Sequence, residues 1–348
     1  MQRPRLVVFD MDGVLVDVSA SYRPTIAATV WDYFSLVLAL AAPPVDLVTP
    51  EEIDLLKRAG GLNNDWDMAA ALIAYLLTLL PEAPSPPQDG STTEAALHGL
   101  RRAAAGLTVD WETVVRRKDV ASLAQTAAQW GGGLAGVQQA ASATNRSLLC
   151  YRGTLRDTDL VTRLFQERYL GGDRFRTTYG LEPRLVLEEA GLCRRETLLV
   201  ARETLTRLAE RYPLGIATGR PRTEALFALE HLGVRDLFRC VITDDDIQEA
   251  EERTWQETGH RPTYRKPDPY GVLAALAGLG TPQEPGLYVG DVPDDIRAAR
   301  AAGRVRPVLA VGCCAASRDR EDLRQAFAVA GADLIVNDLE ELVRWLLA

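Results

Sequence analysis

The second half of the chain alternates short apolar runs with amphipathic stretches. The stretch Arg222–Leu232 is helical in spacing, because Ala225, Leu226 and Leu229 fall on one face and Gly233 follows as a stop. Runs of strand length separate such stretches, and this alternation predicts a parallel sheet covered by helices on both faces. The expected strands are Leu6–Phe9, Pro213–Thr218, Cys240–Ile242, Leu287–Val289, Val308–Val311 and Leu334–Val336. The other expected helices are Tyr270–Gly278, Asp295–Ala302 and one between the last two strands.

Residues 18–200 follow another pattern, in which helical spacing dominates and no convincing strand is found. Thr49–Glu52 forms a capping box with proline at the first helical position, and Ala69–Leu80 is expected to be a buried helix. Pro81–Thr93 is predicted to be a mobile, turn-rich linker, and residues 94–148 a helical sub-insertion.

These patterns predict an α/β protein with a Rossmann-like, doubly wound parallel sheet as its core. Residues 1–17 and 201–348 are assigned to this core, and residues 18–200 to an inserted all-α domain. The extra insertion at about residues 81–148 is expected to be separable, so that deleting residues 83–146 leaves a folded core.

The composition narrows the class of partner. A length of 348 residues makes two domains the default expectation, and 47% hydrophobic residues support a full core. The net charge of −9 without a basic tract argues against nucleic acid, and the apolar run Ala69–Leu80 is too short to span a membrane. Five scattered cysteines, and a chain that begins with a strand, predict reduced thiols, no signal peptide and a cytoplasmic location.

Polar residues follow several of the expected strands. Asp10 and Asp12 come directly after the apolar run Leu6–Phe9, where a carboxylate is costly unless it is paired or binds a metal. Each segment alone has an ordinary explanation as a turn, a strand end or a helix start. Together, however, they stand in order at strand ends, where ligands of open parallel sheets bind. The further segments are Thr218-Gly219, Arg265–Pro269 with Lys266 at its centre, and Val289–Asp295 with Asp291.

The chemistry of these residues fits one task. Clustered carboxylates suit a hard cation such as Mg²⁺, which also accepts phosphate oxygens. A threonine hydroxyl and a lysine ammonium can hold the remaining oxygens of a transferring phosphoryl group. One carboxylate can act as nucleophile, and a second, two residues further on, as general acid and base.

The segments DMDGVLVD, IATGR, RKPDP and VGDVPDDIRAARAAG resemble the four motifs of the haloacid dehalogenase superfamily, over about residues 5–17 and 205–345. The long insertion resembles the branch with a helical cap. The resemblance implies an Mg²⁺-dependent enzyme in which Asp10 is the nucleophile and Asp12 the general acid and base. It implies that Thr218 binds the phosphoryl group, that Lys266 steadies the nucleophile, and that Asp10, the backbone carbonyl of Asp12 and Asp291 bind the metal. Asp295 is implied to support Lys266 and the metal shell.

One feature, the second acidic residue of the first motif, narrows the reaction within the superfamily. Dehalogenases and phosphonate-cleaving members lack the second acidic residue, whereas Asp12 is present here, so a phosphatase for a small phosphomonoester is expected. A sugar-phosphate mutase with the same residues and a non-catalytic scaffold remain the alternatives. The cap is far longer than usual in this branch, and Asp244–Glu252 before Lys266 is acidic and extended.

Substrate-binding residues are expected around the phosphoryl site and in the cap. Gly219 and Arg220 follow the second motif, and Arg23 follows the first. In the cap, the double glycine of Arg58–Trp66 would let the backbone approach a ligand, although helix capping explains Gly60 and Asn64 equally well. This stretch faintly resembles a clade linked to histidine biosynthesis, which makes histidinol phosphate a candidate beside sugar phosphates and phosphoglycolate. The cap candidates are Arg58, Asn63, Asn64 and Trp66.

Overall fold

The computed structural model describes residues 3–58, 60–62, 64–86, 92–317 and 319–348. The chain divides into two compact units, each of which is described by itself. Unit 1 comprises Met1–Ser19 and Arg195–Ala348, and unit 2 comprises Ala20–Arg194. The chain therefore leaves unit 1 after Ser19 and returns to it at Arg195, about 175 residues later.

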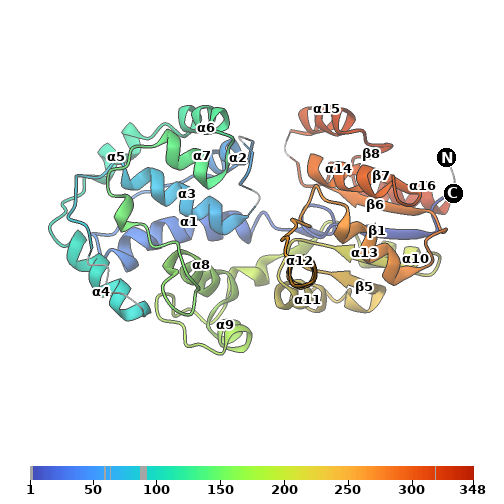
Figure 1. The fold of residues 1–348 in the computed structure, drawn as a ribbon, viewed down its shortest axis with the longest axis horizontal. Helices are drawn as coiled ribbons and strands as arrows, with labels where there is room; N and C mark the ends of the chain where they lie inside the picture. The colour runs from blue at the N-terminus through green and yellow to red at the C-terminus, as the bar shows by residue number, and fades with distance from the viewer. Residues whose placement is uncertain (1–2, 59, 63, 87–91, 318) are drawn as a thin grey trace. The chain divides into compact units, whose positions relative to one another are not determined.

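A sheet of six parallel strands forms the centre of unit 1 (Figure 1). Its order is β5-β4-β1-β6-β7-β8, so the winding reverses beside β1, where open α/β sheets bind their ligands. The doubly wound α/β fold expected from the sequence is confirmed, with each predicted strand present. The strands are β1 (Leu6–Phe9), β4 (Leu214–Ala217), β5 (Phe238–Ile242), β6 (Gly286–Gly290), β7 (Val308–Cys313) and β8 (Leu334–Val336).

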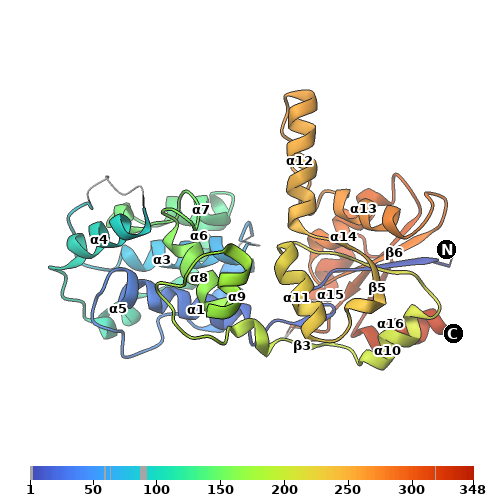
Figure 2. The ribbon, with the colours of Figure 1, turned by 90° about the horizontal axis from the view of Figure 1, so that it is seen from below.

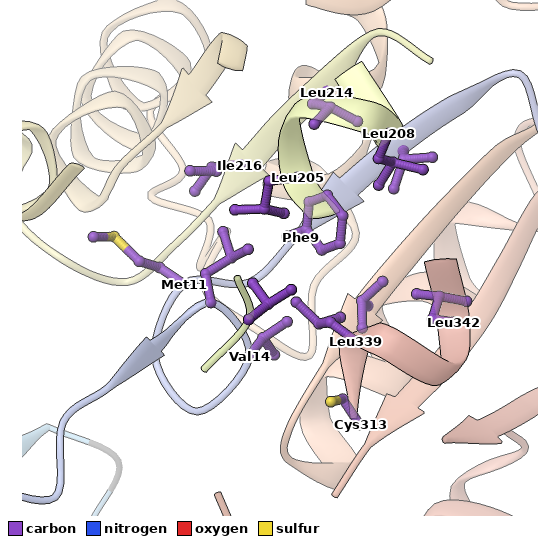
Figure 3. Packing of buried hydrophobic residues seen from close by; sticks show 14 of the residues in the cluster. Phe9, Met11, Val14, Leu205, Leu208, Leu214, Ile216, Cys313, Leu339 and Leu342 are labelled. Atoms are coloured by element: carbon purple, nitrogen blue, oxygen red, sulfur yellow. The ribbon is translucent and has the colours of Figure 1, made fainter. Parts of the chain in front are cut away.

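Helices cover both faces of this sheet because alternate residues of each strand point to opposite sides. Val7 and Phe9 of β1 pack with α10 (Arg202–Ala209), α11 (Arg222–His231) and α16 (Leu339–Leu347). Figure 3 shows Phe9 among Leu205 and Leu208 of α10 and Leu339 and Leu342 of α16. Leu6 and Val8 pack on the other face with α13 (Tyr270–Leu279), α14 (Pro293–Ala302) and α15 (Arg320–Ala330). Strand β1 is therefore packed in the core on both faces, which fixes the position of Asp10 at its end.

Two features of unit 1 were not expected. Residues Val16–Asp17 (β2) and Thr197–Leu198 (β3) pair antiparallel in a small second sheet, and β3 lies in a segment for which no strand was predicted. The acidic stretch after β5 is a helix, α12 (Asp244–Thr258), which stands out from the rest of unit 1 in Figure 2. A capping box between Thr243 and Asp246 begins this helix, and Gly259 in a left-handed conformation ends it.

Among its described residues, unit 2 consists of helices joined by loops and contains no strand. Its α3 packs against α1, α7 and α8, and α2 packs against α6. The predicted capping box is confirmed, since the backbone nitrogen of Thr49 donates to Glu52 at 2.9 Å and α2 begins at Pro50. The helices are α1 (Tyr22–Asp32), α2 (Pro50–Arg58), α3 (Asp65–Leu77), α4 (Thr93–Ala104), α5 (Trp111–Arg117), α6 (Val120–Gln129), α7 (Gly133–Ala140), α8 (Leu160–Leu170) and α9 (Gly172–Tyr179).

The predicted sub-insertion is not a separate appendage of unit 2. The indole nitrogen of Trp111 donates to the carbonyl of Ala41 at 2.8 Å, and its ring meets Phe34 edge to face. Val137 of α7 is fully buried. Because α4–α7 share the apolar core of the helices that precede them, the packing favours a segment that is integral to unit 2 over the detachable one predicted from the sequence. Part of the predicted linker, residues 87–91, lies outside the described residues.

Across the described segments of the chain, the helices are all too short or too polar to cross a bilayer.

Candidate active site

The carboxyl ends of three neighbouring strands carry the first site residues. Asp10 follows β1, Thr218 follows β4 and Asp291 follows β6. The backbone nitrogen of Asp10 donates to the carbonyl of Val289 in β6 at 2.8 Å, which extends the β1–β6 ladder to Asp10. The parallel sheet therefore gathers residues that are far apart in the sequence, as expected from their places at strand ends.

Lys266 joins two of the carboxylates. Its Nζ lies 2.8 Å from an oxygen of Asp10 and 2.8 Å from an oxygen of Asp295. It also lies 5.6 Å from the ring centre of Tyr288, whose hydroxyl donates to Asp295 at 3.1 Å. One ammonium thus holds two carboxylates in place against an aromatic face.

Negative charge is crowded at this point of the sheet. Oxygens of Asp10, Asp291 and Asp295 all lie within 4.8 Å of one another. Burial raises the pKa of Asp10 to about 7, against the opposing effect of Lys266. Burial and the neighbouring carboxylates of Asp295 and Asp10 raise the pKa of Asp291 well above its usual range. Burial alone would lower the pKa of Lys266, but Asp10 and Asp295 raise it well above its usual value. When all three carboxylates are ionised, the cluster consequently carries two more negative charges than the single ammonium of Lys266 can balance.

Asp295 serves mainly to hold its neighbours. It is fully buried at the start of α14. One oxygen accepts from Tyr288 and contacts Lys266, and the other accepts from the backbone nitrogens of Asp291 and Val292 at 3.1 and 3.2 Å. Since both oxygens already have donors, Asp295 fits the supporting role that the family resemblance implies.

Gly13 leaves room for the acidic cluster. It has a φ of +71°, and a Cβ atom at this position would lie 2.0 Å from Oδ2 of Asp291. The position therefore requires glycine both for its backbone conformation and for the space that Asp291 occupies.

Asp12 is paired with a buried arginine. Nε of Arg220 donates to Oδ1 of Asp12 at 2.7 Å, and Nη2 lies 2.5 Å from the same oxygen. Nη1 of Arg220 donates to Glu196 at 2.9 Å, and Glu196 is buried as well. The prediction that Arg220 binds the substrate does not agree with this geometry. Its side chain is only 2% exposed, and its guanidinium is committed to two carboxylates.

Thr218 and Gly219 stand at the end of β4. The Thr218 hydroxyl accepts from the backbone nitrogen of Arg220 at 3.2 Å, and a Cβ atom at Gly219 would meet nothing within 4 Å. The backbone at Gly219 thus borders open space beside the buried hydroxyl of Thr218, as a binding role would require.

The candidate residues of the helical insertion are engaged within unit 2. Arg23 forms an ion pair with Asp54 at 2.9 Å. The side-chain oxygen of Asn64 accepts from the backbone nitrogens of Trp66 and Asp67 as the N-cap of α3, which is the capping alternative considered above. Trp66 is half-buried in the first turn of α3. Asn63 and the side chain of Arg58 lie outside the part of the chain that the structure describes.

The double glycine approaches another part of the chain. The carbonyl of Gly60 accepts from the backbone nitrogen of Gly133 at 2.9 Å. A Cβ atom at Gly61 would lie 2.6 Å from the same nitrogen. The missing side chain of Gly61 therefore makes space for the loop before α7, which gives this glycine a packing role within unit 2.

Two site residues, Tyr288 and Glu196, were missed from the sequence. Tyr288 sits inside an apolar strand, where its periodicity marks it as core, and only its hydroxyl hints at a polar partner. Glu196 lies outside every motif, and its pairing with a residue 24 positions away leaves no periodic signal.

Comparisons with known proteins agree with the fold and the motifs. The family model of haloacid dehalogenase-like hydrolases matches residues 4–303. The imidazoleglycerol-phosphate dehydratase of Phytophthora nicotianae is 27% identical over 301 residues, which are 86% of this chain and 42% of that protein. The validoxylamine A 7'-phosphate phosphatase of Streptomyces hygroscopicus subsp. limoneus is 34% identical over 146 residues, 42% of this chain and 56% of that protein.

This chain thus spans about half the length of both relatives. A crystal structure solved as a structural-genomics target has the same fold, with a TM-score of 0.67 at 20% identity, over 99% of this chain and 98% of that one. The family model covers most of the chain, including all four motifs and the strands that position them. The protein belongs to the haloacid dehalogenase-like hydrolase family.

Proposed function

We propose that this protein is a metal-dependent phosphatase that hydrolyses a small phosphomonoester through a phosphorylated Asp10. The observation that carries the proposal is the contact of Lys266 with Asp10 at the end of β1, beside Asp291. A buried carboxylate held by an ammonium, next to further carboxylates, suits attack on a phosphoryl group better than a purely structural role. The phosphatase named among the relatives supports the same reaction class.

The residues present fit a magnesium ion. Asp10 and Asp291 offer carboxylate oxygens, the ligands that Mg²⁺ prefers, and the backbone carbonyl of Asp12 is the third ligand implied by the family. The raised pKa of Asp291 marks negative charge that a cation would balance. When bound, Mg²⁺ would supply positive charge that offsets the phosphoryl oxygens.

The side chains of unit 1 would divide the reaction between them. An oxygen of Asp10 attacks phosphorus, the bond from phosphorus to the alcohol oxygen breaks, and Asp12 gives that oxygen a proton. Thr218 and Lys266 hold oxygens of the phosphoryl group in both half-reactions. Asp12, now ionised, takes a proton from the water that attacks phosphorus, and Asp10 and inorganic phosphate are released.

We assign unit 2 the role of a cap that selects the substrate. Trp66, Asn64 and Arg23 remain candidate substrate-binding residues within it, with Arg58 and Asn63. The Phytophthora relative is named for imidazoleglycerol phosphate, a phosphorylated imidazole compound. Histidinol phosphate is also one, so we include it as a test substrate beside sugar phosphates and phosphoglycolate. We expect the protein to act in the cytoplasm.

Phosphate release across this panel tests the proposal, measured with Mg²⁺, with EDTA and with Asp10→Asn as the blank. We expect one preferred substrate, with release lost in EDTA and in the variant. Isomerised product without phosphate would instead indicate a mutase. No turnover of any phosphomonoester in the presence of Mg²⁺ would contradict the proposal and favour a non-catalytic role.

A further inference from the structure

A buried chain of three charged side chains ends at the proposed general acid. Glu196 and Arg220 have side chains that are 0% and 2% exposed, whereas that of Asp12 is 34% exposed. The guanidinium stands between the two carboxylates, with Nη1 on Glu196 and with Nε and Nη2 on Asp12. Burying the charges of Glu196 and Arg220 this completely costs free energy of desolvation, which is offset only by good ion-pair geometry and further hydrogen bonds.

Both nitrogens that address Asp12 contact the same oxygen, Oδ1. Oδ1 accepts a hydrogen bond from Nε and lies 2.5 Å from Nη2 in an ion pair, so it is a poor place for a proton, and a proton on Asp12 belongs on Oδ2. Fixing one oxygen also fixes the direction of the other. The arginine therefore sets which oxygen of Asp12 exchanges the proton and where it points.

The backbone holds Glu196 and Asp12 together. Glu196 immediately precedes β3, and β3 pairs with β2, with Val16 opposite Leu198. Strand β2 begins four residues after Asp12, at the end of the loop that carries this residue. The backbone nitrogen of Leu199 also donates to the carbonyl of Leu15 at 2.9 Å. The loop itself is tight, because the backbone nitrogens of Leu15 and Val16 both donate to Met11. The carboxylate that anchors Arg220 is thus tied to the segment that carries the acid.

We propose that Arg220 and Glu196 are positioning residues that aim the Oδ2 atom of Asp12 at the leaving alcohol and later at the attacking water. The inference rests on the proposed phosphatase function and on Asp12 as its general acid. It replaces the expectation that Arg220 binds substrate. Lysine cannot take over the role, since a single ammonium lacks the planar fork that bridges two carboxylates.

The test compares two substrates of nearly equal shape, 4-nitrophenyl phosphate and phenyl phosphate. The nitrophenol leaves without much help from a proton, whereas phenol needs it, and general acid catalysis contributes about 10²–10⁴-fold. The value of kcat/KM reports the steps up to departure of the alcohol, so the shared hydrolysis of phosphorylated Asp10 does not mask the difference. The Asp12→Asn variant cannot donate the proton, so its ratio of kcat/KM values for the two esters gives the largest difference expected.

We expect Arg220→Lys and Glu196→Gln to lower kcat/KM for phenyl phosphate about tenfold more than for 4-nitrophenyl phosphate, in the direction seen with Asp12→Asn. Adding Arg220→Lys to Asp12→Asn should not widen the ratio further, because both changes remove the same interaction. Arg306→Lys is the matched control. Arg306 is also buried, but it donates to the carbonyls of Thr281 and Glu284, so both substrates should change by one common factor.

Equal losses on the two substrates in Arg220→Lys, beside a clear split in Asp12→Asn, would overturn the inference and leave the proposed function intact. A wild-type protein that releases phosphate from neither ester nor from the wider panel would overturn the proposed function, and the inference with it. If Glu196→Gln does not fold, Arg220→Lys keeps the test decisive, because it retains the positive charge between the carboxylates.

Discussion

At the scale of single residues, the site places carboxylates where burial disfavours their charge. Burial raises the pKa of Asp10 to about 7, and Lys266 must serve Asp10 and Asp295 together. A neutral residue of the same shape in place of Asp10 relieves repulsion from Asp291, and Lys266 keeps Asp295 as its partner. Stability and catalysis should therefore respond in opposite ways to one substitution.

Asp10→Asn is expected to lower turnover by about four orders of magnitude, because the amide is a poor nucleophile. Its melting temperature should equal or exceed that of the wild type, because burial and the neighbouring carboxylates disfavour the charge of Asp10 by more than Lys266 favours it. Phosphate release and thermal unfolding followed by circular dichroism measure the two effects. Retained turnover would exclude Asp10 as the nucleophile, and a large fall in melting temperature would contradict the electrostatic explanation.

Gly13→Ala is expected to lower phosphate release by at least about tenfold and to raise the Mg²⁺ concentration needed, because the new methyl group displaces Asp291. Gly259→Ala is the matched control. Gly259 has nearly the same φ, +70° against +71°, but a Cβ there meets nothing within 4 Å. Both variants carry about 1–2 kcal/mol of backbone strain, and only the first should lose activity. Equal activity in the two would show that Asp291 does not need the space.

At the scale of elements, the N-cap of α8 in unit 2 is a buried aspartate, Asp159. Asp159 accepts from the backbone nitrogen and the hydroxyl of Thr162, each at 2.8 Å. Burial raises its pKa to about 6, against the opposing effect of these hydrogen bonds. A raised pKa means that the folded state binds the proton more tightly than the unfolded state. This contribution to stability is present at low pH and is lost as the pH rises through about 6.

Asp159→Asn keeps an acceptor for the helix cap and removes the titration. Relative to the wild type, we expect the variant to gain about 2 kcal/mol in free energy of unfolding between pH 4.5 and pH 8. Urea unfolding at the two pH values measures the gain, and Asp119→Asn, at the exposed N-cap of α6, is the control. A gain at low pH instead of high pH would reverse the sign and contradict the assigned cause.

Elements of regular pattern could be predicted from the sequence, and those without one could not. Strands such as β6 are apolar throughout because both faces are buried, and α11 shows a clear apolar face before Gly233. In α12 only Ile247 and Ala250 are buried, so the helical period is too weak to recognise. Strand β3 has two residues and is fixed by its pairing with β2, which no local pattern encodes.

At the scale of the whole molecule, the sub-insertion at about residues 81–148 packs into the core of unit 2. Beyond the contacts of Trp111, the hydroxyl of Tyr33 donates to the carbonyl of Leu148, and that of Tyr75 accepts from the backbone nitrogen of Asp119. Removing residues 83–146 would expose the apolar surfaces of α2 and α3, which pack on α6 and α7, at a cost of about 25 cal/mol per Å². The insertion should therefore resist deletion.

We expect a chain without residues 83–146 to aggregate or to lose the folded helices of unit 2. Limited proteolysis with mass spectrometry and gel filtration would follow the two outcomes. Fragments from residues 20–194 should appear early, ahead of cleavage in the sheet of unit 1. A monomeric, protease-resistant deletion variant would show that the insertion packs on unit 2 without stabilising it.

The site also combines residues that could be recognised in the sequence with ion pairs that only the folded chain brings together. The positions of Asp10, Thr218 and Asp291 could be predicted, because a parallel sheet collects its strand ends, and Lys266 could be predicted from the motif around it. The partners could not. Arg220 looked like an exposed charge next to the phosphoryl site, and only the folded chain places Glu196 beside it. Ion pairs between distant segments depend on tertiary structure and leave no spacing in the sequence.

The most direct test of the account is the detection of a phosphoryl group on Asp10. Asp12→Asn protein would be mixed with 4-nitrophenyl phosphate and Mg²⁺, quenched in acid, digested and analysed by mass spectrometry. Because this variant lacks the base for the second half-reaction, the adduct should accumulate on the peptide that contains Asp10 and be absent when Asp10→Asn is added. Turnover by the wild type, with no adduct in this variant or with an adduct on another residue, would contradict the account.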